Sequence, residues 1–198
     1  MTKRASGKYE RHARDFYATP ETPILKLIPH LAGNSFAEPM CGDGAIVRVL
    51  ESKGYEARFL ADLEPQGEMT GRARKMDVLD TTANDYVNCS AIISNPPWPR
   101  RGGKGDPTVS IIKHLVGVQF WPVWLLLSAD FMHTKYFNEV APHCHRAISV
   151  GRVSWMHNNQ VGYDNAVWYQ FSWIRRDPSE HCWFVPNLPL DKNGKGKW

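Results

Sequence analysis

The sequence predicts a single α/β domain built on a doubly wound, mostly parallel sheet that ends in an antiparallel C-terminal hairpin. Short apolar runs alternate with segments of helical periodicity over much of the chain, as in consecutive βαβ units. Two runs, 91–94 and 123–128, are apolar almost throughout, which is typical of strands buried on both faces of a parallel sheet. Strand-like segments at 147–150 and 166–174, the second rich in aromatic residues, predict the hairpin.

The predicted elements follow one another in the order that such a sheet requires. The first is a helix that begins at Thr22-Pro23, because threonine caps helices well and proline suits the first helical position. It ends at Gly33-Asn34, and its apolar face carries Ile24, Leu25, Ile28 and Leu31. A strand over 35–37, a helix carrying Ile46, Val47 and Leu50, and a strand over 55–61 come next. The strands over 91–94 and 123–128 are joined by a helix over 109–118.

Length and composition place the chain among single-domain proteins. Its 198 residues, 42% hydrophobic and 22% charged, suffice to bury one core. We expect the domain to occupy 15–190, between a flexible basic arm at 1–14 and a flexible tail at 191–198. No apolar run approaches the roughly 20 residues of a membrane span, and the basic N-terminus lacks the apolar stretch of a signal peptide. We therefore expect a cytoplasmic protein with no membrane contact.

The four cysteines predict reduced thiols and no metal site. Four are few for a secreted chain of this length, and none forms a CxxC pair. His143-Cys144-His145 and His181-Cys182 contain metal-binding residue types, but their spacing fits no standard zinc finger, and neighbours in a strand point to opposite faces. The tryptophans are expected to lie mostly in the core; these are Trp121, Trp124, Trp155, Trp168, Trp173 and Trp183.

The stretch from Glu38 to Gly44 has the form of a nucleotide-cofactor turn, because a strand runs into Gly42-Asp43-Gly44 and a helix follows. Glu38 stands where the strand ends. It would repel a pyrophosphate and attract the ammonium and sulfonium of S-adenosylmethionine, so we predict the latter cofactor. About twenty residues on, Asp62 ends the second strand, where α/β nucleotide sites usually hold ribose hydroxyls.

The strand over 91–94 leads into Asn95-Pro96-Pro97-Trp98, which predicts the catalytic turn. Two prolines fix the backbone and donate no N–H, so the turn presents mainly acceptors. The exocyclic amine of adenine is a poor nucleophile, and the Asn95 side-chain oxygen and the Pro96 carbonyl can accept its N–H bonds as it attacks. Trp98 offers a flat face for an extruded base. The alternative interpretation is a double-proline turn followed by a core tryptophan.

Together these motifs resemble the amino-methyltransferase family, specifically the DNA N6-adenine methyltransferases of phages and prophages. The resemblance spans most of 15–175 and implies a Rossmann-like class I methyltransferase fold. Segment 15–20 resembles the family's N-terminal cofactor motif, 38–44 its glycine motif and 61–65 its ribose motif, while Asp77 stands where the family contacts the cofactor adenine. The residues thus assigned to S-adenosylmethionine are Tyr17, Thr19, Pro20, Glu38, Pro39, Cys41, Gly42, Gly44, Asp62, Asp77 and Asn95.

Asn95–Trp98 resembles the family's catalytic tetrapeptide, Asp/Asn/Ser-Pro-Pro-aromatic, which is the most specific of these signals. The resemblance implies that the methyl group moves from sulfonium to amine by direct, inverting displacement, with no covalent enzyme intermediate and no metal. Asn rather than Ser at position 95 favours adenine N6 over cytosine N4. Cytosine C5 chemistry is disfavoured because it resembles a Pro-Cys nucleophile, and no cysteine here follows a proline.

Basic residues just after the catalytic turn predict contact with DNA. Arg100, Arg101 and Lys104 lie in the glycine-rich segment 99–107, which is suited to close over a flipped nucleotide and hold phosphates. The alternative is a surface loop without a role. A second loop, 154–165, is also available. Too few residues remain between Asp77 and Asn95, and after Ile174, for a large target-recognition region, so sequence specificity should be short or relaxed.

Two other functions stay open. One is a methyltransferase acting on adenine in RNA or on a protein glutamine; the other is a catalytically silent nucleic-acid-binding relative. Protein-glutamine enzymes usually end the tetrapeptide in tyrosine and lack the basic loop, so Trp98 and Arg100-Arg101 argue against them. The acids and the amide at positions 38, 62 and 95 argue against a silent relative. Both a monomer and a homodimer are compatible with the sequence.

Overall fold

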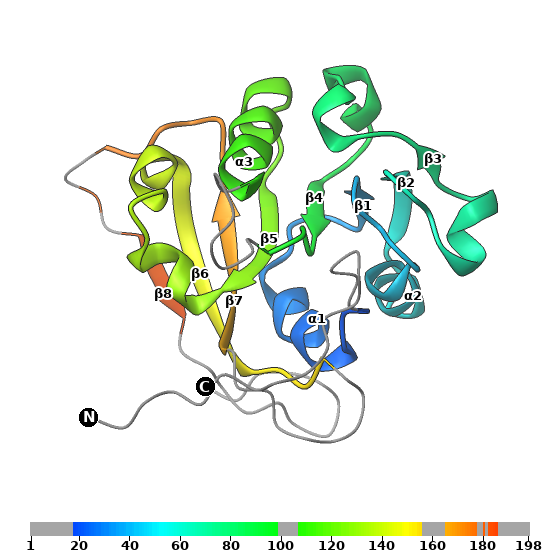
Figure 1. Ribbon diagram of the computed structural model, residues 1–198, viewed down its shortest axis with the longest axis horizontal. Coiled ribbons are helices and arrows are strands. Elements are labelled where there is room, and N and C mark those ends of the chain that lie inside the picture. The colour runs from blue at the N-terminus through cyan, green and yellow to red at the C-terminus, as the bar shows by residue number, and fades with distance from the viewer. Residues whose placement is uncertain (1–17, 99–106, 156–164, 178–179, 181, 186–198) are drawn as a thin grey trace.

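The computed structural model describes residues 18–98, 107–155, 165–177, 180 and 182–185. Within these residues one sheet of eight strands has the order β3-β2-β1-β4-β5-β7-β6-β8 (Figure 1). Its parallel part consists of β1 (Ser35–Glu38), β2 (Glu56–Asp62), β3 (Arg74–Lys75), β4 (Ala91–Ser94) and β5 (Val123–Ser128). β7 (Asn165–Phe171) is antiparallel to β5 and to β6 (Cys144–Arg152), and β8 (Trp183–Val185) pairs with β6 in parallel.

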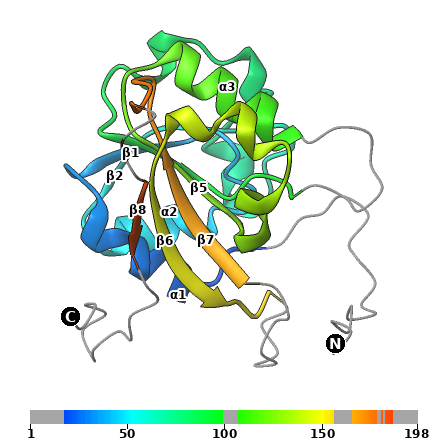
Figure 2. The ribbon, with the colours of Figure 1, turned by 90° about the vertical axis from the view of Figure 1, so that its left-hand side faces the viewer.

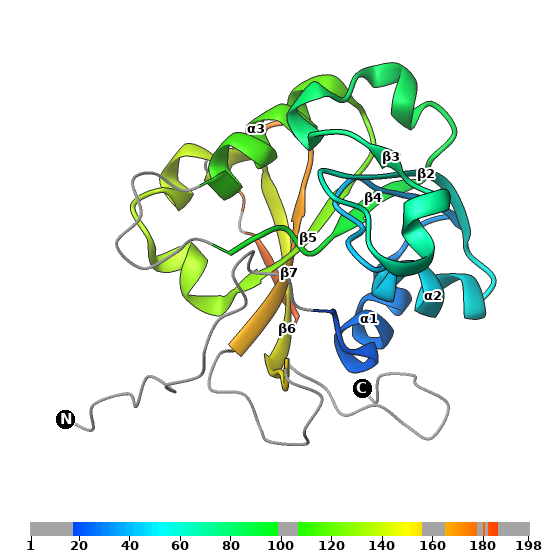
Figure 3. The same ribbon diagram turned by 45° about the vertical axis from the view of Figure 1, so that its right-hand side comes forward.

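Helices cover both faces of this sheet. α1 (Glu21–Leu27) and α2 (Ala45–Ser52) lie on one face and α3 (Pro107–Val118) on the other, which the turned views of Figures 2 and 3 show as three layers. Short 3-10 helices connect the elements, at Ile28–His30, Gly67–Gly71, Val78–Asp80, Ala83–Tyr86, Ala129–His133, Phe137–Glu139 and Ala141–His143.

Side chains alternate across the sheet and fill two cores. Along β5, Val123, Leu125 and Leu127 pack into the core under α3, whereas Trp124 and Leu126 pack into the core under α1 and α2. All five are at most 2% exposed. Burying such a side chain contributes about 1.5–3 kcal/mol, so a strand covered on both faces needs apolar residues at nearly every position. This explains why the segment is apolar almost throughout.

The predicted α/β class is confirmed, including the antiparallel β6–β7 hairpin at the end of a mostly parallel sheet. Some boundaries differ. The first helix begins at Glu21 after an extended Pro20, so Thr22 is not its cap; an acidic residue in the first turn suits the helix dipole. Its buried residues are Pro23, Ile24 and Leu27. β3 and β8 were not predicted, because two and three residues are too few for a periodic signal.

The tryptophan expectation is wrong for three residues. Trp124 and Trp168 are buried as expected, but Trp121, Trp173 and Trp183 are 40%, 46% and 74% exposed. The first precedes β5, the second follows β7 and the third lies on the edge strand β8, so none of the three lies within a central strand.

Several predictions lie outside the described residues. These are the basic arm 1–14, Tyr17, the basic residues Arg100, Arg101 and Lys104, and the tail 191–198. Within the described part of the chain, no helix has the length and apolar character needed to cross a bilayer.

Candidate active site

The candidate site lies where the strand order of the sheet reverses. The chain proceeds from β1 to β2 and β3 on one side, then returns to form β4 and β5 on the other. In α/β sheets the carboxyl ends of the strands at such a point border a crevice that binds ligands. A cavity of about 730 Å³ opens there, lined by Glu38 at the end of β1, Asp62 at the end of β2 and Asn95 just after β4. Its volume suits a small-molecule cofactor.

The turn after β1 is held by backbone contacts with β2. The Cys41 amide donates to the Ala61 carbonyl at 3.0 Å, and the Gly42 amide donates to Asp62 Oδ2 at 2.8 Å. Gly44 then opens α2 with φ of +81°, and a Cβ there would lie 2.8 Å from Cε of Met69. Glycine at position 44 is therefore required by the left-handed backbone and by the close approach of Met69.

Glu38 is a buried carboxyl with an unsatisfied oxygen. It is 2% exposed, and its Oε2 has no hydrogen-bond partner among the described residues. Burial raises the pKa of Glu38 well above its ordinary value, and the nearby carboxylates of Asp62 and Asp43 raise it further. An unsatisfied buried carboxyl is costly unless a cation or donor meets it. The position therefore suits a ligand with a positively charged group.

The cavity is acidic as a whole. Its described lining contains no lysine, arginine or histidine. Such a lining opposes a pyrophosphate and attracts cations, because like charges in a partly buried site repel strongly. The five carboxylates that line it are Glu38, Asp43, Asp62, Glu64 and Asp77.

Asp62 and Asp77 brace the backbone as well as facing the cavity. Asp62 accepts from the Gly42 amide with one oxygen and from the Glu64 amide, at 2.7 Å, with the other, so it pins the turns after β1 and β2 together. Asp77 caps the short helix Val78–Asp80 by accepting from the Leu79 amide at 2.9 Å. An ionised carboxylate has about four acceptor positions, so each side chain can still accept from a ligand.

Two leucines that the motif analysis missed form an apolar part of the lining. Leu63 and Leu79 are 62% and 45% exposed, and both face the cavity. An exposed leucine has no local sequence signal, but Leu63 directly follows the strand-ending Asp62 and Leu79 lies two residues after Asp77. The two leucines can contact the faces of a flat apolar group, and the neighbouring acids can accept hydrogen bonds from its edge.

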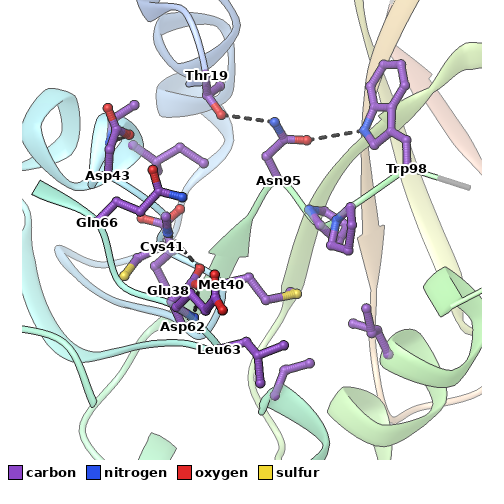
Figure 4. Close-up of a pocket in the computed structure, with 18 of the residues that line it drawn as sticks. Thr19, Glu38, Met40, Cys41, Asp43, Asp62, Leu63, Gln66, Asn95 and Trp98 are labelled. Carbon is purple, nitrogen blue, oxygen red and sulfur yellow. Dashed lines mark hydrogen bonds between the residues drawn. The ribbon is translucent and has the colours of Figure 1, made fainter. Parts of the chain in front are cut away.

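Asn95 is held at both ends of its carboxamide, as Figure 4 shows. Its Nδ2 donates to Oγ1 of the buried Thr19 at 3.1 Å. Its Oδ1 accepts from Nε1 of Trp98 at 3.2 Å, and the same indole N–H lies 3.1 Å from the Leu126 carbonyl of β5. These contacts fix the orientation of the amide. An amide oxygen has two lone pairs, so Oδ1 keeps one for a further donor.

Trp98 is anchored in the wall of the site. Its ring meets that of Trp155 edge to face, with centroids 5.2 Å apart and an interplanar angle of 81°, and both rings pack beside the core under α1 and α2. The indole therefore contributes a hydrogen bond to Asn95 in addition to the flat surface that the sequence predicts. The first turns of α3 close the cavity opposite, through Pro107, Ser110 and Ile111.

The structure brings most of the predicted site residues together. Among the described candidates, Pro20, Pro39 and Gly44 do not line the cavity: Pro20 precedes α1, Pro39 follows β1, and Gly44 caps α2. Across the described residues, no three His, Cys, Asp or Glu side chains gather in a way that could hold a metal ion. The predicted residues in the lining are Thr19, Glu38, Cys41, Gly42, Asp62, Asp77, Asn95, Pro96, Pro97 and Trp98.

Solved structures with a similar fold include proteins described as candidate methyltransferases. A chain of a type I restriction–modification system matches 94% of this chain with a TM-score of 0.59 and 15% identity. The chain has the class I methyltransferase fold. A candidate class I S-adenosylmethionine-dependent methyltransferase from Listeria monocytogenes matches 91% of it (TM-score 0.55, 13% identity), and a candidate RNA methyltransferase from Pyrococcus horikoshii matches 84% (TM-score 0.56, 13% identity).

The matched region makes up a different share of each of these structures. The chain covers 47% of the restriction–modification chain, 68% of the Listeria protein and 91% of the Pyrococcus protein. No protein-family model and no curated protein matches the sequence.

Proposed function

We propose that this protein transfers a methyl group from S-adenosylmethionine to the exocyclic N6 of adenine in DNA. The observation that carries the proposal is the Asn95 carboxamide, whose orientation is fixed by Thr19 and Trp98 at the edge of an acidic cavity. It offers an acceptor oxygen beside two prolines that donate no N–H.

The residues of the cavity fit this cofactor. S-adenosylmethionine supplies a methyl group made electrophilic by its sulfonium. The unsatisfied, buried Oε2 of Glu38 suits the ammonium of the methionine portion. Asp62 suits the ribose hydroxyls, Asp77 the adenine amine, and Leu63 with Leu79 the faces of the adenine ring. The absence of basic side chains from the described lining supports this assignment over a dinucleotide.

The acceptor side of the site suits an amine. Asn95 Oδ1 and the Pro96 carbonyl can each accept one N–H of an adenine N6 amine, which orients its lone pair and stabilises the positive charge that develops on nitrogen. A base reaches such a site only when it leaves the stack, and Trp98 with Trp155 provides aromatic surface for it. Thr19 and Trp98 keep the acceptor oxygen preorganised, which limits reorganisation during the reaction.

DNA is the proposed substrate, and RNA is the alternative. The similarity to a restriction–modification chain supports DNA, as does the basic sequence around Arg100 and Arg101, which lies outside the described residues. The similarity to a candidate RNA methyltransferase supports RNA, because an extruded adenine presents the same edge from either nucleic acid.

The test compares the wild type with Asn95→Ala and with Asn88→Ala, which removes an exposed amide that does not line the cavity. Each protein is incubated with S-adenosylmethionine and unmethylated DNA or RNA, and the products are digested to nucleosides for mass spectrometry. We expect N6-methyladenine from DNA with the wild type and Asn88→Ala alone. Asn95→Ala should bind the cofactor within a few-fold of the wild type, because the asparagine acts mainly in the transition state.

Methylation confined to RNA would show that RNA, and not DNA, is the substrate. Methylation of a different atom, or equal turnover by Asn95→Ala, would overturn the assignment of the acceptor site. Absence of S-adenosylmethionine binding by calorimetry would overturn the cofactor and favour a catalytically silent relative.

A further inference from the structure

The fold brings two cysteine thiols into contact although 38 positions separate them in the chain. Sγ of Cys144 lies 3.7 Å from Sγ of Cys182. Cys144 is the first residue of β6 and is 1% exposed, whereas Cys182 directly precedes β8 and is half-buried. The parallel pairing of β6 with β8, which sets Arg146 opposite Trp183, holds the two thiols together.

We infer that Cys144 and Cys182 form an oxidisable dithiol, which a low-molecular-weight disulfide such as oxidised glutathione converts to an intramolecular disulfide. A disulfide bond is about 2.05 Å long, so closure requires the two sulfur atoms to approach from contact distance. One of them belongs to Cys182, which is only half-buried and directly precedes the edge strand β8.

Cys182 is the thiol equipped to react first. The hydrogen-bonding contact with the Cys144 thiol lowers the pKa of Cys182, against the effect of burial, and the positive charge of Arg176 contributes. The same guanidinium group donates from Nε to the Cys144 carbonyl at 3.1 Å, which keeps it beside the pair. The other two cysteines are unlike this one, because burial raises the pKa of Cys41 to about 12 and that of Cys89 to about 11.

The reaction is two thiol–disulfide exchanges. The Cys182 thiolate attacks one sulfur of oxidised glutathione, forming a mixed disulfide and expelling one glutathione thiolate. Cys144 then loses its proton to that thiolate or to solvent, and its sulfur attacks Sγ of Cys182 and expels the second glutathione. The protein loses two thiol protons and two electrons, and oxidised glutathione takes up both to give two molecules of reduced glutathione.

The disulfide would link β8 to β6 at the end of the sheet that lies away from the proposed site. Cys144 pairs with Phe171, which pairs with Val123 at the start of β5, whereas the cavity lies beyond the carboxyl ends of the parallel strands. β8 has three residues, and its Trp183 and Phe184 are 74% and 62% exposed, so little apolar burial holds it. We therefore expect oxidation to raise stability and to leave cofactor binding within twofold.

The test uses the full-length chain, reduced and then incubated with oxidised glutathione. Remaining thiols are blocked with N-ethylmaleimide and the digested protein is mapped by mass spectrometry. We expect a peptide pair joined through Cys144 and Cys182, with Cys41 and Cys89 recovered as blocked thiols. The melting temperature should rise by about 5 °C or more on oxidation, since closing a loop of this length restricts the unfolded chain.

Two variants separate the steps. Cys144→Ser should stop at a stable glutathione adduct on Cys182, and Cys182→Ser should take up no glutathione and show no change in melting temperature. Recovery of both wild-type residues as blocked thiols, a wild-type adduct at Cys182 without ring closure, or a disulfide between two chains would each overturn the inference. None of these outcomes bears on methyl transfer, which is assayed separately under reducing conditions.

Discussion

Replacing the buried Glu38 by glutamine should stabilise the free protein and weaken its binding of S-adenosylmethionine. The carboxyl is almost inaccessible, its Oε2 is unsatisfied in the described structure, and burial together with Asp62 and Asp43 raises its pKa. Stability contributed by the neutral carboxyl is present below the ordinary carboxyl pKa and is lost as the pH rises through the raised pKa. Glutamine keeps the shape and removes this loss, so the stability advantage of Glu38→Gln should grow with pH.

Cofactor affinity should depend on pH in the opposite direction to the stability of the free protein. A cation beside Glu38 favours the ionised carboxylate, so binding releases protons between the ordinary and the raised pKa, and affinity rises with pH across that window. A hydrogen bond between charged groups contributes about 1.5–3 kcal/mol. Its loss in Glu38→Gln corresponds to a Kd about 10- to 150-fold higher.

Isothermal titration in buffers of different ionisation enthalpy measures both the affinity and the number of protons released. Thermal unfolding of the free protein over the same pH range measures stability. The matched control is Glu56→Gln, which alters an exposed carboxylate at the other end of β2, paired with Arg58. Equal affinity and equal proton release in wild type and Glu38→Gln would refute the role of the buried carboxyl.

Three further predictions address other parts of the site. Thr19→Val removes the acceptor for Asn95 Nδ2, so kcat should fall about tenfold while the cofactor Kd changes little, and Thr19→Ser should restore kcat. Steady-state kinetics measures kcat and calorimetry measures Kd; a change in Kd alone would contradict the positioning role. Leu79→Ala removes apolar surface from the cavity and should raise the cofactor Kd about five- to tenfold by calorimetry, whereas an unchanged Kd would place the adenine elsewhere. Changing Arg100 and Arg101 together to alanine should reduce the slope of log affinity for DNA against log salt by about 2, and an identical slope would exclude phosphate contacts by this pair.

Sequence predicted the parts of the site that depend on local rules. Glu38 and Asp62 end two strands and Asn95 follows a third, all with apolar runs visible in the sequence, and parallel strands present their carboxyl ends at the same edge. The glycine turn was also visible, since a left-handed residue before a helix needs glycine. The proximity of these residues could therefore be predicted without knowing any side-chain contact.

Contacts between distant segments could not be predicted in the same way. Thr19 and Asn95 are 76 positions apart, and their hydrogen bond depends on how the segment before α1 lies against the turn after β4. Leu63 and Leu79 are apolar but exposed, so neither periodicity nor burial marks them. The adjacency of Cys144 and Cys182 depends on β8, which is too short to be recognised, so their spacing in the sequence does not predict the contact.

The acidic lining bears on turnover as well as on binding. S-adenosylmethionine carries one positive charge more than the demethylated product, because transfer of the methyl group converts the sulfonium to a neutral thioether. Five carboxylates without a basic side chain in the described lining attract the charged form more strongly than the neutral one. In the proposed enzyme, the reaction itself would therefore weaken binding of the spent cofactor and favour its exchange for a fresh molecule.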